Sequence, residues 1–311
     1  MIVISEFMDE DAIRRGLDGF DVLYDPTLVD RPDDLAAALA TAEALIVRNR
    51  TQVRGALLDA APQLKVVGRL GVGLDNIDME ACKARGIAVY PASGANDVSV
   101  AEYVIATALL LLRGAYGATA AVAAGEWPRN ALVGREIAGK RMGLVGYGSI
   151  ARETARRAIA LGMEVAAFDP YLPADHAAWS GPWGKVTALA LDDLLATSDV
   201  LSLHVPLTAE TRHMIGTEAL ARMKPDAIVI NAARGGIVDE AAIAAALTAG
   251  RLGGAALDVF EDEPLKAERG GVFAGVPNLV LTPHIAGVTM ESNIRVSWVT
   301  VDNVRKHLRG E

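Results

Sequence analysis

Three polar side chains in the C-terminal half have the types that proton-coupled chemistry on a small organic acid requires. Arg234, Glu263 and His284 each follow a short apolar run, at 227–230, 254–257 and 279–282. A guanidinium forms two parallel hydrogen bonds with a carboxylate, and a histidine gives or takes a proton near neutral pH. A neighbouring carboxylate favours the protonated ring. These residue types suit acid–base catalysis on a substrate that carries a carboxylate.

Each of the three residues also has an ordinary structural interpretation. Arg234 could form a surface ion pair, Glu263 stands among other acids in a solvated turn, and His284 could cap a loop beside a proline. The catalytic interpretation requires that the three side chains meet. If the apolar runs are parallel strands, their carboxyl ends lie at one edge of the sheet, which is where open α/β sheets bind ligands.

The segment GYGSIA at 146–151 predicts a dinucleotide-binding turn. It follows the apolar run 142–145 and precedes a helical pattern. Gly146 permits the tight turn, Gly148 lets the backbone approach a pyrophosphate, and the helix N-terminus offers free N–H groups to the phosphates. Asp169 follows about 20 positions later, where a carboxylate accepts hydrogen bonds from a ribose 2′-hydroxyl. Because its charge repels the 2′-phosphate of NADP, the predicted cofactor is NAD.

Two series of alternating apolar runs and amphipathic stretches must position these residues. The first runs from residue 2 to residue 90, and the second begins at residue 142. Such alternation predicts an α/β protein with two doubly wound parallel-sheet domains. The last stretch, 288–308, is helical in pattern with no strand after it, and we expect it to pack on the first domain. We therefore expect a flavodoxin-like substrate domain of residues 1–94 and 286–311, with a Rossmann NAD-binding domain of residues 95–285 inserted in it.

Composition and charge limit the classes of function. The 30 Lys and Arg residues against 39 Asp and Glu give a net charge of −9, which disfavours nucleic acid and anionic membranes as partners. The apolar segment 98–112 is too short for a membrane span and contains Glu102, so we expect a buried helix around which a homodimer forms. The start of the chain lacks an export pattern and Cys82 is a lone cysteine, so the expected location is the cytoplasm.

Several ordered motifs resemble those of the D-isomer-specific 2-hydroxyacid dehydrogenases, over nearly the whole chain. They are GRLGVGLDNID at 68–78, SVAE at 99–102, GYGSIA at 146–151, HVPLT at 204–208, NAARGGIVDE at 231–240, LDVFEDEP at 257–264 and TPHIAG at 282–287. In that family the arginine of the RGG segment binds the substrate carboxylate and carbonyl, the histidine of PHIAG exchanges the proton, and the glutamate before the proline pairs with that histidine. The matching positions are Arg234, His284 and Glu263.

The resemblance also implies residues that contact the cofactor and the substrate. Besides Gly146 and Gly148, the implied NAD contacts are Val72, Ser149, Ile150, Asp169, Val205, Ala232, Asp258 and Gly287. The backbone at Val72 and Gly73 is implied to help Arg234 and His284 bind the substrate.

Arginines near the start of the chain bear on which 2-hydroxy acid is used. Arg48 and Arg50 follow one predicted strand, and Arg69 ends the next. In the phosphoglycerate dehydrogenase branch, an arginine that matches Arg48 lies near the substrate phosphate. We therefore expect a substrate with a second anionic group, such as 3-phosphoglycerate or 3-sulfolactate, and the opening segment 4–10 is similar to bacterial sulfolactate dehydrogenases. Alternatively, the arginines pair with surface acids, which favours a glyoxylate or hydroxypyruvate reductase.

Another class of function competes with the enzyme. Corepressors related to this family keep its fold and its three polar residues, so an NAD(H)-sensing binding protein is the alternative. Such a protein needs a peptide-binding surface, and no appended segment here supplies one. A metal site is not expected, because His176, His204, His213 and His307 have no spacing that suits one.

Overall fold

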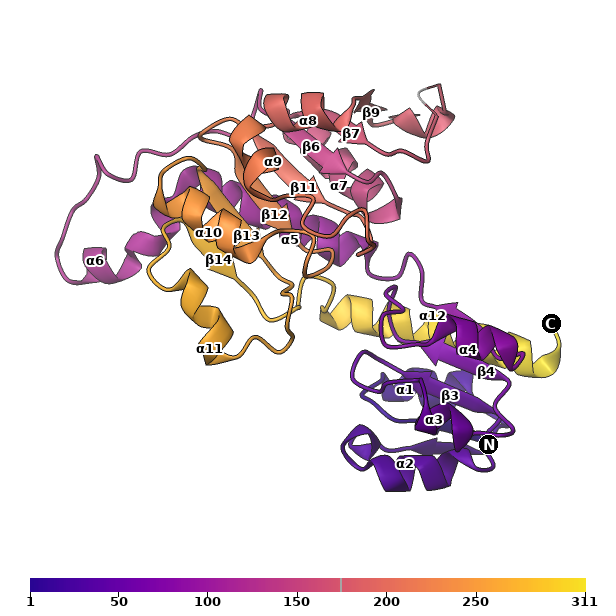
Figure 1. Ribbon diagram of the computed structural model, residues 1–311. Coiled ribbons are helices and arrows are strands. Elements are labelled where there is room, and N and C mark those ends of the chain that lie inside the picture. The colour runs from indigo at the N-terminus through magenta and orange to yellow at the C-terminus, as the bar shows by residue number, and fades with distance from the viewer. Residues whose placement is uncertain (174) are drawn as a thin grey trace. The chain divides into compact units, whose positions relative to one another are not determined.

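The computed structural model describes residues 1–173 and 175–311. The chain divides into two compact units (Figure 1). Unit 1 consists of Met1–Asn96 and Val288–Glu311, and unit 2 consists of Asp97–Gly287. Each unit is a parallel sheet with helices on both faces.

The sheet of unit 1 has five parallel strands in the order β2-β1-β3-β4-β5. The strands are β1 (Ile2–Ile4), β2 (Val22–Tyr24), β3 (Ala44–Val47), β4 (Val66–Arg69) and β5 (Ala88–Pro91). The helices are α1 (Glu10–Gly16), the 3₁₀ turn η1 (Leu28–Asp30), α2 (Pro32–Leu39), α3 (Ala56–Asp59), α4 (Met79–Ala84) and α12 (Met290–Arg309). This strand order is that of flavodoxin-like sheets.

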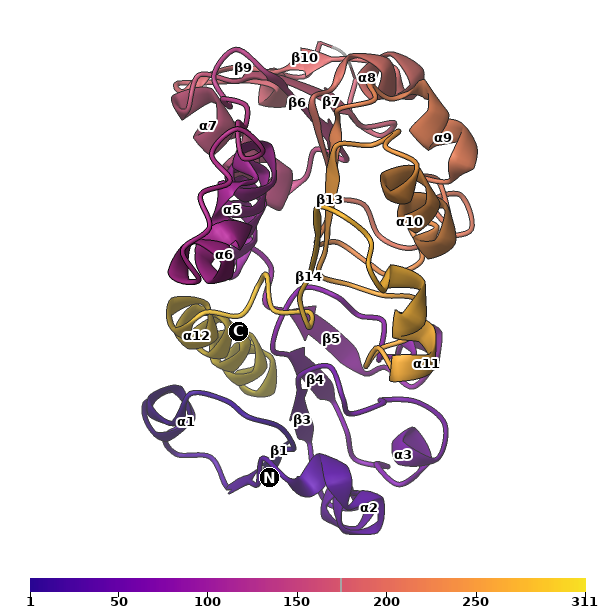
Figure 2. The same cartoon turned by 90° about the vertical axis from the view of Figure 1, so that its left-hand side faces the viewer.

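Two apolar layers enclose the sheet of unit 1. Leu35, Leu39 and Cys82, from α2 and α4, pack on one face. Val296 and Val301 of α12 pack on the other face, where α12 lies against α1 and β4 (Figure 2). The last helix of the chain is therefore part of the first unit, and burial of its apolar stripe supplies most of what holds it there.

The sheet of unit 2 has seven parallel strands in the order β10-β7-β6-β11-β12-β13-β14. They are β6 (Arg141–Val145), β7 (Glu164–Phe168), β10 (Thr187–Ala188), β11 (Val200–Leu203), β12 (Ile228–Asn231), β13 (Gly254–Leu257) and β14 (Leu279–Leu281), and β8 (Ser180–Gly181) pairs with β9 (Gly184–Lys185) in a separate hairpin. If β6, β7, β10, β11, β12 and β13 are numbered 1 to 6 in chain order, they lie in the sheet in the order 3-2-1-4-5-6. This is the Rossmann arrangement.

Helices cover both faces of this sheet. Figure 2 shows α5 (Asp97–Arg113) and α7 (Ser149–Ala160) on one side, and α8 (Leu191–Thr197), α9 (Thr217–Arg222) and α10 (Glu240–Thr248) on the other. The shorter elements are η2 (Ala115–Ala118), α6 (Thr119–Ala123), η3 (Ala177–Trp179), α11 (Ala267–Gly270) and η4 (Gly271–Phe273). The predicted α/β class with two doubly wound parallel sheets is confirmed.

The apolar stretch 98–112 forms α5, and its side chains, including Val104, Ala108 and Leu111, are buried in the core of unit 2. The expectation of a buried helix is confirmed. Across the described residues no single helix is long and apolar enough to cross a membrane, although α5 and the segment Ala115–Ala123, bent by 66° relative to each other, meet the length and composition criteria as a pair.

Two predicted helices are shorter in the structure. The pattern at 32–44 indicates one helix, but α2 ends at Leu39 and a turn in which the Ala42 N–H bonds the Leu39 carbonyl leads into β3. The pattern at 54–61 yields only α3, because Val53 forms a bridge with Ile77 and keeps the chain extended before it. A local turn in one place and an isolated bridge in the other outweigh helix propensity.

Candidate active site

The three residues singled out for catalysis follow neighbouring strands of unit 2. Arg234 follows β12, Glu263 follows β13 and His284 follows β14. These strands are adjacent and parallel, so their carboxyl ends lie side by side. Gly235 brings the first two loops into contact, since a Cβ atom there would lie 1.7 Å from the Phe260 carbonyl oxygen. Any other residue at this position would push the Arg234 loop away from the Glu263 loop.

His284 and Glu263 form a hydrogen-bonded pair. The distance between His284 Nδ1 and Glu263 Oε2 is 2.7 Å, and Glu263 Oε1 accepts the Phe260 N–H at 3.0 Å. Burial raises the pKa of Glu263, but the bond from His284 and its charge, the Phe260 N–H and the charge of Arg234 together bring that pKa below its ordinary value. Glu263 is therefore ionised at neutral pH and accepts Nδ1–H, which leaves His284 Nε2 to exchange a proton.

Asp258 holds the loop that carries His284. Its side chain is 1% exposed, its Oδ1 accepts the Thr282 hydroxyl at 2.6 Å and the Ile285 N–H at 2.8 Å, and its Oδ2 accepts the Ala286 N–H at 2.9 Å. Its own carbonyl accepts the His284 N–H at 2.8 Å. His284 has φ +52, a conformation that side-chain-bearing residues adopt at a cost. The bonds to Asp258 offset that cost.

Arg234 is positioned by Asn231, the last residue of β12. Asn231 is 1% exposed; its amide nitrogen donates to the Arg234 carbonyl at 2.8 Å and its side-chain oxygen accepts the Ala233 N–H at 3.1 Å. The guanidinium donates to the Ala233 carbonyl at 2.5 Å and lies close enough to Glu263 for its charge to lower the pKa of that carboxyl. Its planar donor set suits a carboxylate ligand.

The predicted dinucleotide turn fits a pyrophosphate. Gly146, with φ +87, lets the turn pass the end of β11, because a Cβ atom there would lie 2.5 Å from the His204 carbonyl oxygen. Gly148 is the N-cap of α7 and makes no capping side-chain bond, and a Cβ atom added to it would meet no other atom within 4 Å. Open space therefore lies beside Gly148 at the N-terminus of α7, where helix N–H groups bind phosphates.

Asp169 lies beside this turn, directly after β7. Its Oδ2 accepts the Tyr147 N–H at 2.9 Å and its Oδ1 accepts the Tyr171 N–H at 3.0 Å. Both bonds orient the carboxylate and leave further lone pairs for hydroxyl donors. The arrangement suits a ribose with a free 2′-hydroxyl.

The other predicted cofactor and substrate residues fall into two groups. In unit 2, Ser149 and Ile150 begin α7, and Val205, Ala232, Asp258 and Gly287 follow β11, β12, β13 and β14 in turn. In unit 1, Val72 and Gly73 lie in the loop after β4, and Arg48 lies directly after β3. The carboxylate of Asp258 accepts hydrogen bonds from the His284 loop. The motif pattern did not indicate this role.

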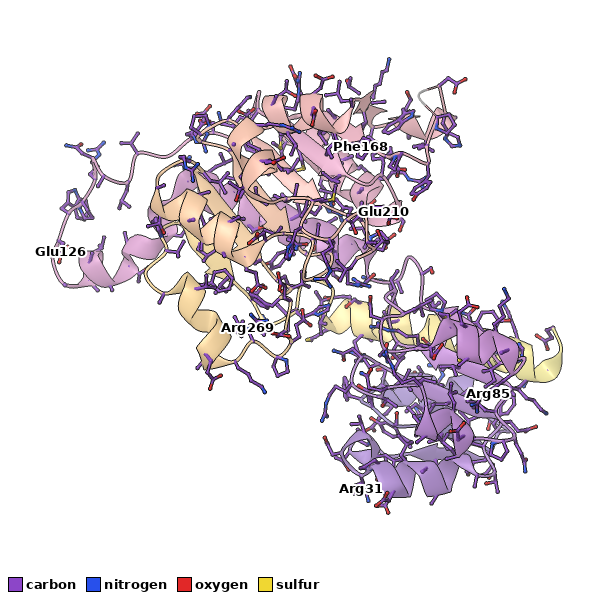
Figure 3. The ribbon with its side chains drawn as sticks, in the orientation of Figure 1. Arg31, Arg85, Glu126, Phe168, Glu210 and Arg269 are labelled. Carbon is purple, nitrogen blue, oxygen red and sulfur yellow. The ribbon has the colours of Figure 1, made fainter. Side chains whose placement is uncertain are left out.

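Some contributors stand in the quoted motifs but were given no role from the sequence. Asn231 begins NAARGGIVDE and Thr282 begins TPHIAG, and they act through short bonds to Arg234 and Asp258. Arg269, on α11, pairs with Asp262 beside Glu263 (Figure 3). In the part of the chain that the structure describes, no group of three or more His, Cys, Asp and Glu side chains could hold a metal ion.

The chain is similar to known proteins of one family. The family model described as "D-isomer specific 2-hydroxyacid dehydrogenase, NAD binding domain" matches residues 105–286. The chain is 57% identical over 307 residues to an (S)-sulfolactate dehydrogenase of Chromohalobacter salexigens. The matched region covers 99% of this chain and 98% of that protein.

A D-3-phosphoglycerate dehydrogenase of Mycobacterium tuberculosis is 44% identical over 285 residues, which is 91% of this chain and 53% of that protein. The chain thus spans about half the length of that relative. Among solved structures, a D-lactate dehydrogenase from Aquifex aeolicus in complex with NAD and lactic acid superimposes with a TM-score of 0.84 at 29% identity, covering 100% of this chain and 96% of the other.

Replacing Asp258 by Ala leaves the two N–H groups and the Thr282 hydroxyl without their acceptor. We expect a loss of about 3 kcal/mol in the free energy of unfolding, measured by urea denaturation with tryptophan fluorescence. The control is Thr282→Val, which removes the hydroxyl that bonds Asp258 and Tyr103 and keeps both N–H bonds, and which should cost about 1–2 kcal/mol. Equal losses in the two variants would show that the N–H bonds contribute little.

Proposed function

Since this chain belongs to the family of D-isomer specific 2-hydroxyacid dehydrogenases, we propose that Arg234, Glu263 and His284 are its catalytic residues. The protein is an NAD-dependent oxidoreductase acting on the CH–OH group of 2-hydroxy acids. The observation that carries the assignment is the 2.7 Å hydrogen bond between His284 and Glu263. The loop that carries Glu263 contacts the loop that carries Arg234. A partly exposed histidine paired with an ionised carboxylate is the arrangement that general acid–base catalysis uses.

The turn at the start of α7 and Asp169 are the residues that would hold NAD, with the pyrophosphate at the helix N-terminus and the ribose at the carboxylate. Bound NAD supplies the hydride acceptor for oxidation at C2, and NADH supplies the hydride donor for reduction. The contacts of Val72, Val205, Ala232, Asp258 and Gly287 with the cofactor are part of the same proposal.

The chain's own residues bind the acid and move the proton. Arg234 binds the substrate carboxylate through two N–H groups and draws electron density from the C2 oxygen. In oxidation, His284 Nε2 takes the hydroxyl proton as the C2–H bond breaks. Glu263 stabilises the resulting imidazolium through Nδ1–H. In reduction, His284 returns the proton to the oxygen, so each direction leaves the site ready for the other.

We further propose that the substrate carries a second anionic group, a sulfonate or phosphate at C3, which Arg48 binds. Two observations support this. The relative matched over almost its whole length is named a sulfolactate dehydrogenase, and the Mycobacterium tuberculosis relative a phosphoglycerate dehydrogenase. In unit 1, Arg50 pairs with Asp30, whereas Arg48 bonds the neutral side chain of Asn293. The surface-pair interpretation therefore applies to Arg50 and does not apply to Arg48.

A homodimer formed around α5 and the segment after it is also proposed. Tyr116, Trp127 and Val133, within one stretch of 18 residues, are 66%, 78% and 81% exposed, and exposed apolar surface is typical of an interface. A cytoplasmic location remains part of the proposal, and the buried free thiol of Cys82 is compatible with it.

Replacing His284 by Ala should lower kcat by about 10³-fold, because the proton loses its acceptor, while NADH still binds. Stopped assays of NADH oxidation measure kcat, and quenching of NADH fluorescence measures the dissociation constant. His176→Ala, at an exposed histidine of unit 2, is the control and should behave as wild type. An unchanged kcat in His284→Ala removes this residue from catalysis; NADH binding without turnover in the wild-type protein favours an NAD(H) sensor.

A panel of 2-oxo acids tests the substrate class. We expect the highest kcat/KM with 3-sulfopyruvate or 3-phosphohydroxypyruvate, and a lower value with glyoxylate or hydroxypyruvate. Arg48→Met should lower kcat/KM for the preferred acid by about 100-fold, since it removes one partner of a charge pair. If glyoxylate and hydroxypyruvate are the best substrates of the wild-type protein, the enzyme is a reductase of small acids and Arg48 has another role.

Light scattering on the purified protein tests the oligomer. We expect twice the mass of one chain, and we expect Trp127→Glu to shift the distribution toward the monomer because it places a charge in an apolar contact. A wild-type monomer at micromolar concentration contradicts the proposed dimer.

A further inference from the structure

We propose that Asn293 is a specificity-determining residue: its neutral side-chain oxygen orients Arg48 without neutralising it, so the guanidinium keeps its charge for an anionic group of the substrate. This inference rests on the proposed function, in which Arg48 binds a sulfonate or phosphate. It concerns residues of unit 1 only, which lie in the loop after β3 and in the first turn of α12.

Other arginines of unit 1 have acidic partners. Arg31 pairs with Asp25 and Asp34, and Arg85 pairs with Asp59; both arginines are labelled in Figure 3. Arg50, two residues after Arg48, pairs with Asp30. Across residues 1–173 and 175–311, Arg48 forms no ion pair, unlike Arg31, Arg50 and Arg85.

The contacts of Arg48 hold its side chain without forming an ion pair. Nη2 donates to Asn293 Oδ1, and the guanidinium carbon lies 5.7 Å from the centroid of the Phe7 ring. Nε is buried and has no hydrogen-bond partner. Burial lowers the pKa of Arg48, with Glu6 and Tyr24 opposing that effect. A partly buried cation with an unused N–H is costly by itself and is stabilised when an anion arrives.

Glu6, a buried acid near Arg48, accepts hydrogen bonds from backbone N–H groups. Its side chain is 4% exposed and accepts three N–H groups, from Arg48 at 2.9 Å, Arg50 at 3.1 Å and Thr51 at 2.9 Å. Those bonds use its lone pairs and fix the loop from which Arg48 projects. Glu6 therefore acts as a positioning residue, and its charge raises the pKa of Arg48 without an ion pair.

Asn293 is well placed to set the direction of Arg48. It lies in the first turn of α12, where its N–H donates to the Thr289 carbonyl at 3.0 Å, and Thr289 and Ser292 form a capping box. A guanidinium only donates hydrogen bonds, so the oxygen of the Asn293 amide must face it. An aspartate here would have the same shape and the same acceptor, but its charge would form an ion pair with Arg48 and compete with the substrate.

Asn293→Asp is therefore the informative substitution, and Asn303→Asp is its matched control. The control makes the same chemical change on the same helix, about 15 Å further along its axis. We measure kcat and KM for 3-sulfopyruvate and glyoxylate in wild type and both variants. The dissociation constant for NADH and the Tm report on integrity.

The expected result for Asn293→Asp is a rise in KM for 3-sulfopyruvate that lowers the ratio of kcat/KM, 3-sulfopyruvate over glyoxylate, at least about tenfold. Asn303→Asp should keep the wild-type ratio. Asn293→Leu, which removes the acceptor without adding charge, should lower the ratio less than Asn293→Asp does.

The outcomes separate this inference from the proposed function. If wild type prefers 3-sulfopyruvate and Asn293→Asp keeps that preference, the role of Asn293 is overturned while the proposed substrate class stands. If Asn293→Leu loses as much as Asn293→Asp, charge is not the determinant and the inference is equally overturned. If the wild-type enzyme shows no preference for the acid with two anionic groups, the proposed role of Arg48 is contradicted, and the inference on Asn293 is contradicted with it.

Discussion

The buried carboxylate of Asp258 is the interaction on which the reactive end of unit 2 depends. It accepts a hydroxyl and two N–H groups from the segment around His284, and its backbone bonds both Asn231 and His284. Three adjacent strands are joined through this one residue at their carboxyl ends. His284 is held at φ +52 as a result, with Nδ1 directed at Glu263. Removing an acceptor with this many donors leaves several buried polar groups unsatisfied, so the geometry of the histidine and the stability of the loop have one cause.

Charge is distributed differently in the two units. In unit 2, bonds and charge from His284 and Arg234 lower the pKa of Glu263, so a negative charge lies beside the ring that becomes positive in the proposed mechanism. In unit 1, the Glu6 carboxylate accepts hydrogen bonds from backbone N–H groups, and the Arg48 guanidinium donates to the neutral amide of Asn293. An acid or base that is paired internally stabilises the fold, whereas one that is held but not neutralised is available to a ligand. This contrast separates Arg48 from Arg50 despite their closeness in the sequence.

Much of the fold could be predicted from the sequence, because alternation of short apolar runs with amphipathic stretches is a local property. The strands β6, β12, β13 and β14 lie within one residue of the apolar runs 142–145, 227–230, 254–257 and 279–282, and GYGSIA forms the turn between β6 and α7. The helical patterns at 32–44 and 54–61 are longer than α2 and α3, because a turn after Leu39 and the bridge from Val53 to Ile77 limit those helices. The site roles assigned by motif stay proposals, supported by the pairing of His284 with Glu263.

The sequence by itself determined the order of the elements, the α/β class, and the residue types at each strand end, since these follow from periodicity and from motifs a few residues long. Only the tertiary structure decided which polar side chains form hydrogen bonds or ion pairs with each other and which keep an unused donor or charge. Arg48 and Asn293 are 245 positions apart, and Asp258 and Ala286 are 28 apart. Such partners are chosen by how helices and loops pack on the finished sheets, and no local pattern encodes that a given arginine will meet an amide oxygen and not a carboxylate.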